Sequence, residues 1–266
     1  MNYLVCIKPV PDPACYDRVA IDPVTKTMVR SELPMVINPP DKHALEAALQ
    51  LREQTGGRVI LVGMAPPGAV ATIKEGLAMG GDEAYLLSDR LFAGSDTLAT
   101  ARVLAAGIKK IGPYQLVFTG NASADGGTSH VPAQLAVMLG IGHVNNVEQV
   151  ALNSPKEIII ASRFEKGYVK YRGRPPLVLG VSKKLNTPRY ITVPGIMAAQ
   201  NKKVNLLSAR DLDLPEAFTG LEGSPTRPGD LHVPRLGRKS ERLEGKPEEI
   251  ADQLIGIMRA AGVINA

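Results

Sequence analysis

The segment GNASADGGTSHVPAQLA, residues 120–136, contains residue types suited to holding a phosphate. Gly126 and Gly127 would let the backbone approach a ligand closely, while Thr128 and Ser129 would add hydroxyl donors. The segment follows a short apolar run and leads into a helical pattern, so it is predicted to connect a strand to a helix. Unpaired backbone N–H groups and the helix dipole make such a turn attractive to an anion.

Asp125 lies directly before the two glycines, and two roles are open to it. Its carboxylate could accept a hydrogen bond from a ribose hydroxyl, or it could simply cap the turn. The segment is not a Walker A loop, because no Gly-Lys-Thr/Ser follows, and no GxGxxG motif follows the first predicted strand. Taken by itself, the glycine turn is as compatible with a structural role as with phosphate binding.

Three further loops are predicted to lie near this turn. CIKPVPD (6–12) follows the first predicted strand, GMAPPGA (63–69) follows the second, and INPPDKHALE (37–46) leads into the first helix. Ligands of a parallel α/β sheet gather at the carboxyl ends of its strands, and these small or proline-rich loops suit main-chain contacts to a flat adenosine. We therefore expect a nucleotide in this cleft, with ordinary loop chemistry as the alternative.

No set of residues for catalysis or metal binding accompanies these loops. The four histidines have no metal-ligand spacing, and neither a Ser-His-Asp nor a Cys-His arrangement can be argued, so no metal is expected. Cys6 and Cys15 form no CxxC pattern, and Cys6, inside an apolar run, is expected to be a buried thiol. Any chemistry that this chain supports must therefore be carried by a cofactor.

The elements that position these loops alternate between strands and helices in the first half of the chain. Strand-like runs occupy 3–8, 58–63, 84–88 and 115–119, and helical patterns begin at Lys42, Ala69 and Asp96. Strands alternating with helices of this length predict βαβ units, a parallel sheet and right-handed crossovers. The predicted fold class is therefore α/β, a Rossmann-like adenine-nucleotide-binding domain.

The second half of the chain has a different pattern. VEQVAL, EIIIAS, YVKY and LVLGV predict an antiparallel meander added to the sheet, and in the first half residues 19–30 predict a small surface hairpin. Residues 247–263 predict a final amphipathic helix, which could dock on a neighbour or pack on its own domain. We predict an α/β domain over 1–224 and a C-terminal arm over 225–266.

Composition restricts the function classes. The chain has 266 residues, of which 44% are hydrophobic and 4% aromatic, as in a folded domain with an aliphatic core. Its formal charge of +5 comes from scattered pairs without interleaved aromatics, so solvated faces, together with a possible acidic protein partner, are favoured over nucleic-acid binding. No run has the length of a membrane span, no targeting segment is visible, and the cysteine usage fits a reducing compartment. A soluble, cytoplasmic protein is expected.

Several ordered segments closely resemble the β subunit of electron transfer flavoproteins. They are VCIKPVPD, IDPVTKTMVR, NPPDKHALEAALQL, GMAPPGAVATIKEGLAMGGDEAYLLSD, ADGGTSHVPAQLA and KLNTPRYITVPGIM, and they span nearly the whole chain. The resemblance implies an α/β nucleotide-binding fold and a heterodimer with a larger α subunit that carries its own FAD. It also implies a C-terminal arm that reaches over this partner.

The resemblance further implies which residues bind the nucleotide and the redox partner. The positions matching the family's adenine-nucleotide site are Cys6, Asn38, Pro39, Pro40, Asp41, Met64, Ala65, Ala122, Ser123, Ala124, Asp125, Gly126, Gly127, Thr128, Ser129, His130, Val131, Pro132 and Ala133. KLNTPRYITVPGI matches the loop by which the β subunit recognises an acyl-CoA dehydrogenase or another flavin dehydrogenase, and Leu185 takes the place of its anchoring leucine. An exposed leucine there would fill a pocket of the partner, and a stray leucine at a hairpin tip is the alternative.

The family that the chain resembles has two branches. In one, the β subunit holds a structural AMP. In the electron-bifurcating branch it holds a second FAD, which accepts hydride from NADH and sends one electron to ferredoxin or flavodoxin and the other through the α-subunit flavin to a dehydrogenase. SDRLFAGSDTLATARVLAAGI (88–108) and DGGTSHV resemble the bifurcating form, in which Asp96 and Thr97 would lie beside the β-subunit flavin. Asp96 and Thr97 also fit an ordinary helix N-cap and its neighbour.

Four positions depart from the usual family pattern. Asn121 and Ala122 replace a basic residue and a glutamine, His130 stands where glutamine is common, and Ala65 replaces a glycine. A nucleotide-binding regulatory protein of the universal-stress type shares the predicted fold and remains the alternative from another class. Such a protein would need neither the partner loop nor the arm. The chain is expected to be an electron-carrier subunit that oxidises NADH only when it holds a second FAD and is paired with the α subunit.

Overall fold

The computed structural model describes residues 2–18, 20–21, 28–29, 33–154, 156–227, 229 and 240–264. By its internal contacts the chain divides into one unit over Met1–Gly229 and a second over Asp230–Ala266. Within the described ranges, no helix is both long enough and apolar enough to cross a bilayer.

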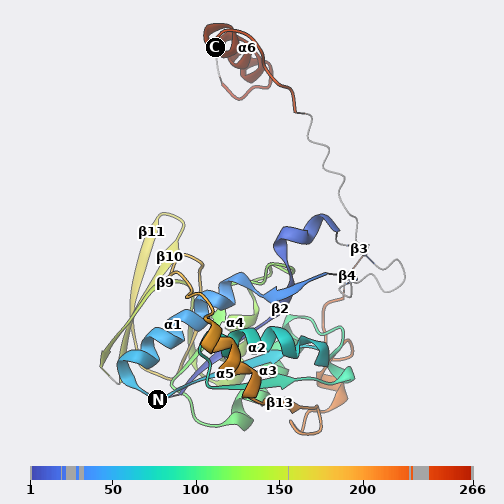
Figure 1. The fold of residues 1–266 in the computed structure, drawn as a ribbon, viewed down its shortest axis with the longest axis vertical. Coiled ribbons are helices and arrows are strands. Elements are labelled where there is room, and N and C mark those ends of the chain that lie inside the picture. Colours follow the sequence, from blue (N-terminus) through green and yellow to red (C-terminus); the bar gives the residue numbers. More distant parts are fainter. Residues whose placement is uncertain are drawn as a thin grey trace. The chain divides into compact units, whose positions relative to one another are not determined.

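A nine-stranded, mostly parallel sheet forms the first unit (Figure 1). In spatial order its strands are β11 (Gly167–Gly173), β10 (Glu157–Phe164), β9 (Gly142–Ser154), β12 (Leu177–Val181), β8 (Leu116–Gly120), β1 (Asn2–Cys6), β6 (Arg58–Met64), β7 (Glu83–Leu87) and β13 (Val204–Leu207). All neighbours from β9 to β13 are parallel, whereas β10 is antiparallel to both β9 and β11. The predicted α/β class, with a parallel sheet built from βαβ units, is confirmed.

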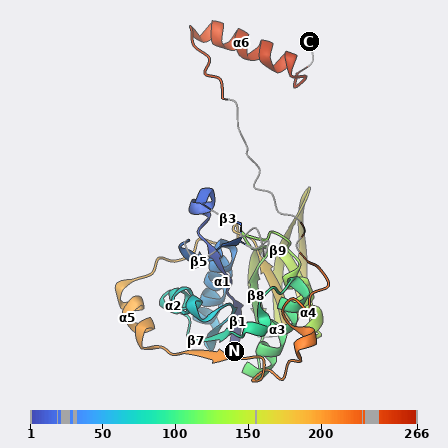
Figure 2. The same cartoon turned by 90° about the vertical axis from the view of Figure 1, so that its right-hand side faces the viewer.

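Helices cover both faces of this sheet. On one face lie α1 (Pro39–Thr55), α2 (Val70–Ala78) and α5 (Val193–Asn201), and on the other lie α3 (Thr97–Ile111) and α4 (Val131–Leu139), as Figure 2 shows. The core divides in the same way, because successive side chains of a strand point to opposite faces. Tyr3 and Val5 pack in the cluster with α1, whereas Leu4 and Cys6 pack in the cluster with α3 and α4.

The strand LVLGV occupies a different place from the one predicted. Strands β9, β10 and β11 form the expected antiparallel meander, but β12 returns to pair in parallel with both β8 and β9. Four of the five residues of β12 are buried, as is typical of an interior parallel strand that helices cover on both faces. The prediction that this strand belongs to the meander was therefore wrong, because an apolar run by itself does not specify its neighbours.

Short elements complete the first unit. Two small sheets pair β2 (Pro9–Pro11) with β5 (Met35–Ile37) and β3 (Ala20–Ile21) with β4 (Met28–Val29), both antiparallel. The paired strands of the predicted hairpin over 19–30 are thus confirmed, while its turn lies outside the described residues. The short 3-10 helices of the described residues are η1 (Pro13–Arg18), η2 (Pro67–Ala69), η3 (Arg90–Phe92) and η4 (Glu216–Phe218).

The second unit contains the helix α6 (Pro247–Ala260), close to the helix predicted over 247–263. Pro247 occupies the first helical position and two glutamates lie in the first turn, both of which favour a helix N-terminus. No residue of α6 is buried, and Leu254 and Ile257 are each about half exposed. Its apolar residues are therefore available for contact with another surface.

The strand order creates a switch point at β1. From β1 the chain moves through β6 to β7 on one side, and then returns through α3 to β8 on the other side of β1. At such a point the connections that leave two adjacent strands diverge to opposite faces, and a crevice opens at the carboxyl ends of the strands. The loops after β1 and β8 therefore frame the candidate site.

Candidate nucleotide-binding site

The carboxylate of Asp41 joins three segments beneath the crevice. Its Oδ2 accepts a hydrogen bond of 2.7 Å from the backbone N–H of Lys8, just after β1. Its Oδ1 accepts bonds of 2.9 Å from the backbone N–H of Gly120, at the end of β8, and from Nδ2 of Asn38, at the start of α1. Asp41 thus holds both strand ends of the switch point against α1.

Asp41 is buried, and burial raises the pKa of its carboxyl from 3.8 to about 7. The hydrogen bonds from Lys8, Asn38 and Gly120 act in the opposite direction, because they favour the charged form. The sequence predicts Asp41 as a nucleotide contact, and the structure places it underneath the loops that form the site.

Asn38 fixes the first part of the glycine-containing loop. Its Oδ1 accepts a hydrogen bond of 2.9 Å from the backbone N–H of Ala124, and its Nδ2 donates one of 3.0 Å to the carbonyl of Ala122. Asn38 is buried, and its own N–H donates to the carbonyl of Lys8 at 2.9 Å. One side chain therefore sets the path of residues 122–124 relative to the end of β1.

Lys8 and Asp125 form an ion pair across the two loops. Lys8 Nζ lies 2.6 Å from Asp125 Oδ1 and 3.2 Å from Ser123 Oγ. The side chain of Asp125 is only 4% exposed, whereas that of Lys8 is 43% exposed. Asp125 therefore ties the loop to β1, and Lys8 presents a cation beside the glycine turn. Lys8 is absent from the residues predicted above, although its place directly after the first strand was a usable signal.

The turn itself exposes backbone donors. Residues 126–130 are exposed, and the N–H groups of Thr128, Ser129, His130 and Val131 donate to no other residue within the described part of the chain. Gly127 and Ser129 adopt left-handed conformations with φ of 61° and 58°. For serine this conformation is uncommon, and such outliers often occur at binding sites. The helix α4 begins at once, so its positive dipole end adds to these donors.

Comparison with known proteins identifies the family of this chain. The model of the electron transfer flavoprotein domain matches residues 25–212. The electron transfer flavoprotein subunit beta of Thermoanaerobacterium thermosaccharolyticum is 43% identical over 265 residues, which cover 99% of this chain and 100% of that protein. The subunit of the same name from Clostridium acetobutylicum is 40% identical over 259 residues, 97% of this chain and 98% of that protein. This chain belongs to the electron transfer flavoprotein β-subunit family.

A third relative of this β subunit is named after a larger assembly. The caffeyl-CoA reductase–Etf complex subunit CarD of Acetobacterium woodii is 40% identical over 266 residues, which cover 99% of this chain and 100% of that protein. Family membership implies an α-subunit partner for this chain. Family membership also excludes the universal-stress-type alternative, because the matches extend over almost the full length of this chain and of each relative.

Other predicted nucleotide contacts of the β subunit lie around the same strand ends. Cys6 and Met64 end β1 and β6 and pack with the α3–α4 side of the core, while Ala65 packs with the α1 side. Burial, with a contribution from the charge of Asp41, raises the pKa of the Cys6 thiol. Cys6 is therefore a buried thiol that stays uncharged, which makes it a poor nucleophile. Pro39 and Pro40 form the first turn of α1, and Pro132 and Ala133 form that of α4.

Asp96 is the N-cap of α3. Its Oδ1 accepts hydrogen bonds from the N–H groups of Leu98 and Ala99 at 2.9 and 3.0 Å, and its Oδ2 accepts two from Thr226 at 3.1 and 2.7 Å. Partial burial raises the pKa of Asp96, but these hydrogen bonds outweigh it and keep the pKa below its usual value. Both oxygens of Asp96 are thus engaged within the protein, while Thr97 is the partly exposed first residue of the helix.

Leu185 does not match its predicted exposure. In the partner loop, residues 184–196, it is partly buried and packs against the α1 side of the core. The prediction of an exposed leucine was therefore wrong, because the loop folds back onto α1. The exposed apolar side chains of the matching segment are Tyr190, which is 95% exposed, Val193, Ile196 and Met197.

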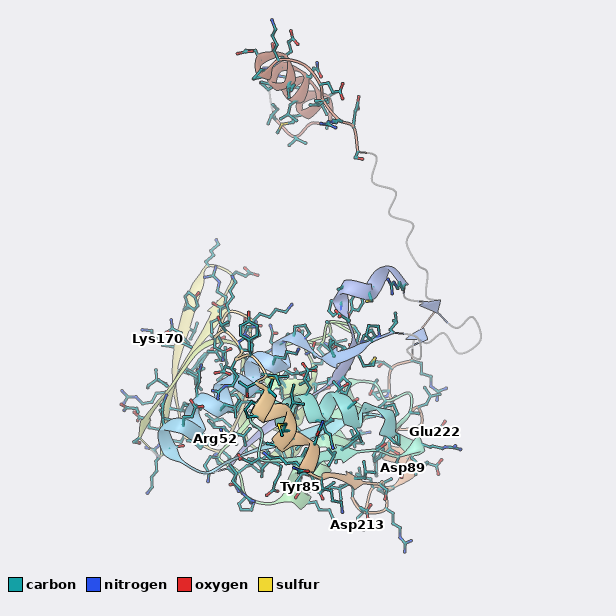
Figure 3. All side chains as sticks on the ribbon, viewed as in Figure 1. Arg52, Tyr85, Asp89, Lys170, Asp213 and Glu222 are labelled. Atoms are coloured by element: carbon teal, nitrogen blue, oxygen red, sulfur yellow. The ribbon has the colours of Figure 1, made fainter. Side chains whose placement is uncertain are left out.

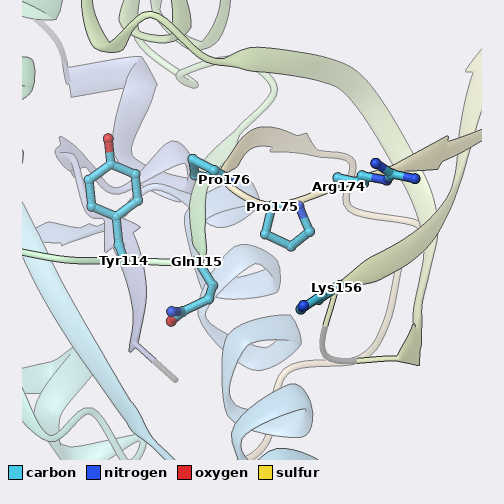
Figure 4. A pocket seen from close by; sticks show the side chains of 6 residues that line it. All are labelled: Tyr114, Gln115, Lys156, Arg174, Pro175 and Pro176. Atoms are coloured by element: carbon cyan, nitrogen blue, oxygen red, sulfur yellow. The ribbon is translucent and has the colours of Figure 1, made fainter.

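One open hollow of the β subunit lies away from this site. A pocket of about 300 Å³ is lined by Tyr114, Gln115, Lys156, Arg174, Pro175 and Pro176 (Figure 4). Tyr114 and Gln115 precede β8, and Pro175 and Pro176 precede β12, so this pocket lies at the amino edge of the sheet. The candidate nucleotide site lies at the carboxyl edge. Within the described residues, no group of His, Cys, Asp or Glu side chains could hold a metal.

Proposed function

We propose that this β subunit holds FAD at the carboxyl edge of β1 and β8 and acts in electron bifurcation together with its α subunit. The observation that carries the proposal is the run of N–H groups from Thr128 to Val131 at the N-terminus of α4, which donate to no partner within the described part of the chain. Such a run suits the pyrophosphate of a dinucleotide. The cation of Lys8 beside this turn adds attraction for the same phosphates.

The residues of the chain hold and orient the nucleotide in this proposal. Asp41 and Asn38 fix the two loops, the turn residues bind phosphate, and Cys6 and Met64 supply an apolar wall. FAD bound here would supply hydride acceptance from NADH and one-electron transfer to ferredoxin or flavodoxin. The resemblance of residues 88–108 to the bifurcating form supports FAD as the nucleotide. Because both carboxylate oxygens of Asp96 are already hydrogen-bonded, Thr97 is the side chain of this pair that remains available to contact the flavin. Structural AMP, for which the same phosphate donors would serve, is the alternative.

We propose a docking role for the partner loop. The exposed side chains of Tyr190, Val193 and Met197, called here the docking surface, would contact an acyl-CoA dehydrogenase or another flavin dehydrogenase. An exposed aromatic residue with apolar neighbours is typical of residues that dominate binding energy in interfaces. The predicted role of Leu185 becomes one of supporting the loop from beneath. The arm over 225–266 would contact the α subunit, and a cytoplasmic location is proposed for the heterodimer.

The nucleotide content of the co-expressed heterodimer tests the proposal. Two FAD per heterodimer and no AMP are expected, followed by NADH-dependent reduction of ferredoxin or flavodoxin. One FAD and one AMP would make this chain the structural and docking half of a simple electron carrier. A chain that purifies without any nucleotide would contradict the placement of the site.

A further inference from the structure

The partner loop is fastened to α1 at two points that are one helical turn apart. Residues His43 and Glu46 on α1 bind Asn186 and Arg189 of the loop, so both pairs share a spacing of three. We call the first contact the Asn186 lock and the second the Arg189 lock.

The Arg189 lock is a forked ion pair. Nε of Arg189 donates to Oε2 of Glu46 at 2.8 Å, and Nη2 donates to Oε1 at 3.0 Å. The backbone N–H of Arg189 donates to the same carboxylate at 3.1 Å, and Nη1 reaches Glu53 Oε1 at 2.7 Å. The fork and the backbone bond together fix both the side chain and the path of the loop at this residue.

The Arg189 lock also stabilises the buried charge of Glu46. The side chain of Glu46 is only 5% exposed, and its burial alone would raise its pKa. The hydrogen bonds and charge of Arg189 outweigh burial and hold the pKa of Glu46 below its ordinary value. A carboxylate buried in this way is costly without its cation, so the position of the loop and the burial of Glu46 depend on each other.

The Asn186 lock uses both ends of one amide. Nδ2 of Asn186 donates to the backbone carbonyl of His43 at 3.0 Å, and Oδ1 of Asn186 lies 3.1 Å from His43 Nδ1. Because Nδ2 is the donor to a carbonyl, Oδ1 is the acceptor and Nδ1 of His43 carries the proton. Asn186 therefore anchors the first half of the loop, as Arg189 anchors the second.

The docking surface begins at the residue after Arg189. Tyr190 is 95% exposed, and Val193 is 70% exposed at the first position of α5. Oγ1 of Thr192 accepts from the N–H of Gly195 at 3.2 Å, and a Cβ at Gly195 would lie 2.5 Å from the carbonyl of Ala78 on α2. The segment is thus held by α1 before Tyr190 and by α2 after Val193.

We propose that Arg189 and Asn186, through Glu46 and His43, are positioning residues that set the docking surface in its partner-binding conformation. This inference rests on the proposed docking function. A loop that is already ordered loses less conformational freedom on binding, so the locks should act on affinity for the dehydrogenase. The exposed ion pair between Arg189 and Glu53 contributes little to the order of the loop, because exposed ion pairs are weak.

The test uses the heterodimer with the α subunit and the variants Arg189→Gln and Arg189→Lys. Lysine keeps the charge but cannot form the fork, so both variants should loosen the loop. The matched control is Arg52→Gln, because Arg52, labelled in Figure 3, is another arginine of α1 and pairs with the carboxylate of Asp82, which does not belong to the loop. Amide hydrogen exchange over 182–192 is expected to be at least about tenfold faster in the Arg189 variants only.

Electron transfer from the reduced heterodimer provides the second readout, with purified butyryl-CoA dehydrogenase and crotonyl-CoA, which takes up two electrons and two protons to become butyryl-CoA, as the probe. The KM for the heterodimer should rise about tenfold in Arg189→Gln, with kcat and nucleotide content unchanged. Unchanged exchange and KM in Arg189→Gln would overturn the proposal, as would an equal effect of Arg52→Gln. If Arg189→Gln does not fold, Asn186→Ala, which removes the other lock, takes its place with the same expectations.

The two proposals fail in different ways. If the wild-type heterodimer transfers no electrons to any flavin dehydrogenase, the docking function is wrong, and with it the role of the locks in affinity. If the wild type is active and the Arg189 variants keep its KM, the docking function stands and the positioning role is wrong.

Discussion

Gly120 lies so close to Asp41 that a Cβ at position 120 would be 2.4 Å from Asp41 Oδ1. The same oxygen accepts the backbone N–H of Gly120 at 2.9 Å. The absence of a side chain at the end of β8 is therefore what lets the buried carboxylate reach this strand.

Gly120→Ala should displace Asp41 and open the loops around the nucleotide. A loss of stability of about 2 kcal/mol is expected, together with loss of bound nucleotide, because the added methyl group also meets Pro40. Urea unfolding and nucleotide analysis of the purified heterodimer measure both effects. Gly68→Ala is the control, since a Cβ there meets open space, and equal behaviour of the two variants would contradict the role of Gly120.

The buried carboxyl of Asp41 should make the stability of the first unit depend on pH. The folded protein keeps this proton up to a pH of about 7, whereas the unfolded chain releases it near 3.8. Between these values the folded state binds more protons, so the free energy of unfolding should fall as pH rises, by up to about 3 kcal/mol from pH 5 to 8.

Urea unfolding of the chain at pH 5 and pH 8 measures this dependence. Asp41→Asn should lose most of the slope, because an amide does not titrate in this range. An identical slope in the wild type and the variant would assign the pH dependence to other groups.

Lys8→Met should weaken nucleotide binding several-fold, because it removes the exposed cation beside the turn and the ion pair with Asp125. Nucleotide released from the heterodimer during dialysis, followed by absorbance, measures the effect. Lys74→Met is the matched control, since within the described ranges Lys74 donates only to the carbonyl of Gln200, on α5. A nucleotide affinity unchanged in Lys8→Met would remove Lys8 from the site.

Thr128→Val should also weaken nucleotide retention, by about 1–2 kcal/mol, through loss of a hydroxyl donor to phosphate. The side chain is exposed, so folding stability should not change. Isothermal titration of the nucleotide-free heterodimer with AMP and with FAD measures the difference. Equal affinities for wild type and variant would contradict the placement of the phosphates at this turn.

Leu185→Ala and Tyr190→Ala should separate support of the partner loop from docking. Leu185 packs against the core, so its truncation should lower stability by about 1–2 kcal/mol. Tyr190 is almost fully exposed, so its truncation should leave stability unchanged and raise the KM for the dehydrogenase. If Tyr190→Ala transfers electrons with the wild-type KM, the docking surface lies elsewhere.

Much of the fold follows from the sequence because the relevant signals are local. The apolar runs at 58–63 and 115–119 and the helical pattern that begins at Asp96 correspond to elements of the structure, as does the helix over 247–263. The glycine turn was recognisable for the same reason, since its residue types act through their own backbone.

The neighbours of each strand and the partners of each buried charge were decided only by the tertiary structure. An apolar run such as 177–181 fits a meander or an interior parallel strand equally well, and only packing against β8 and β9 selects between them. Lys8 and Asp125 are 117 positions apart, and Glu46 and Arg189 are 143 apart, so no local pattern connects them. Leu185 shows the same limit, because the sequence contains a leucine between polar residues, and only the return of its loop onto α1 buries it.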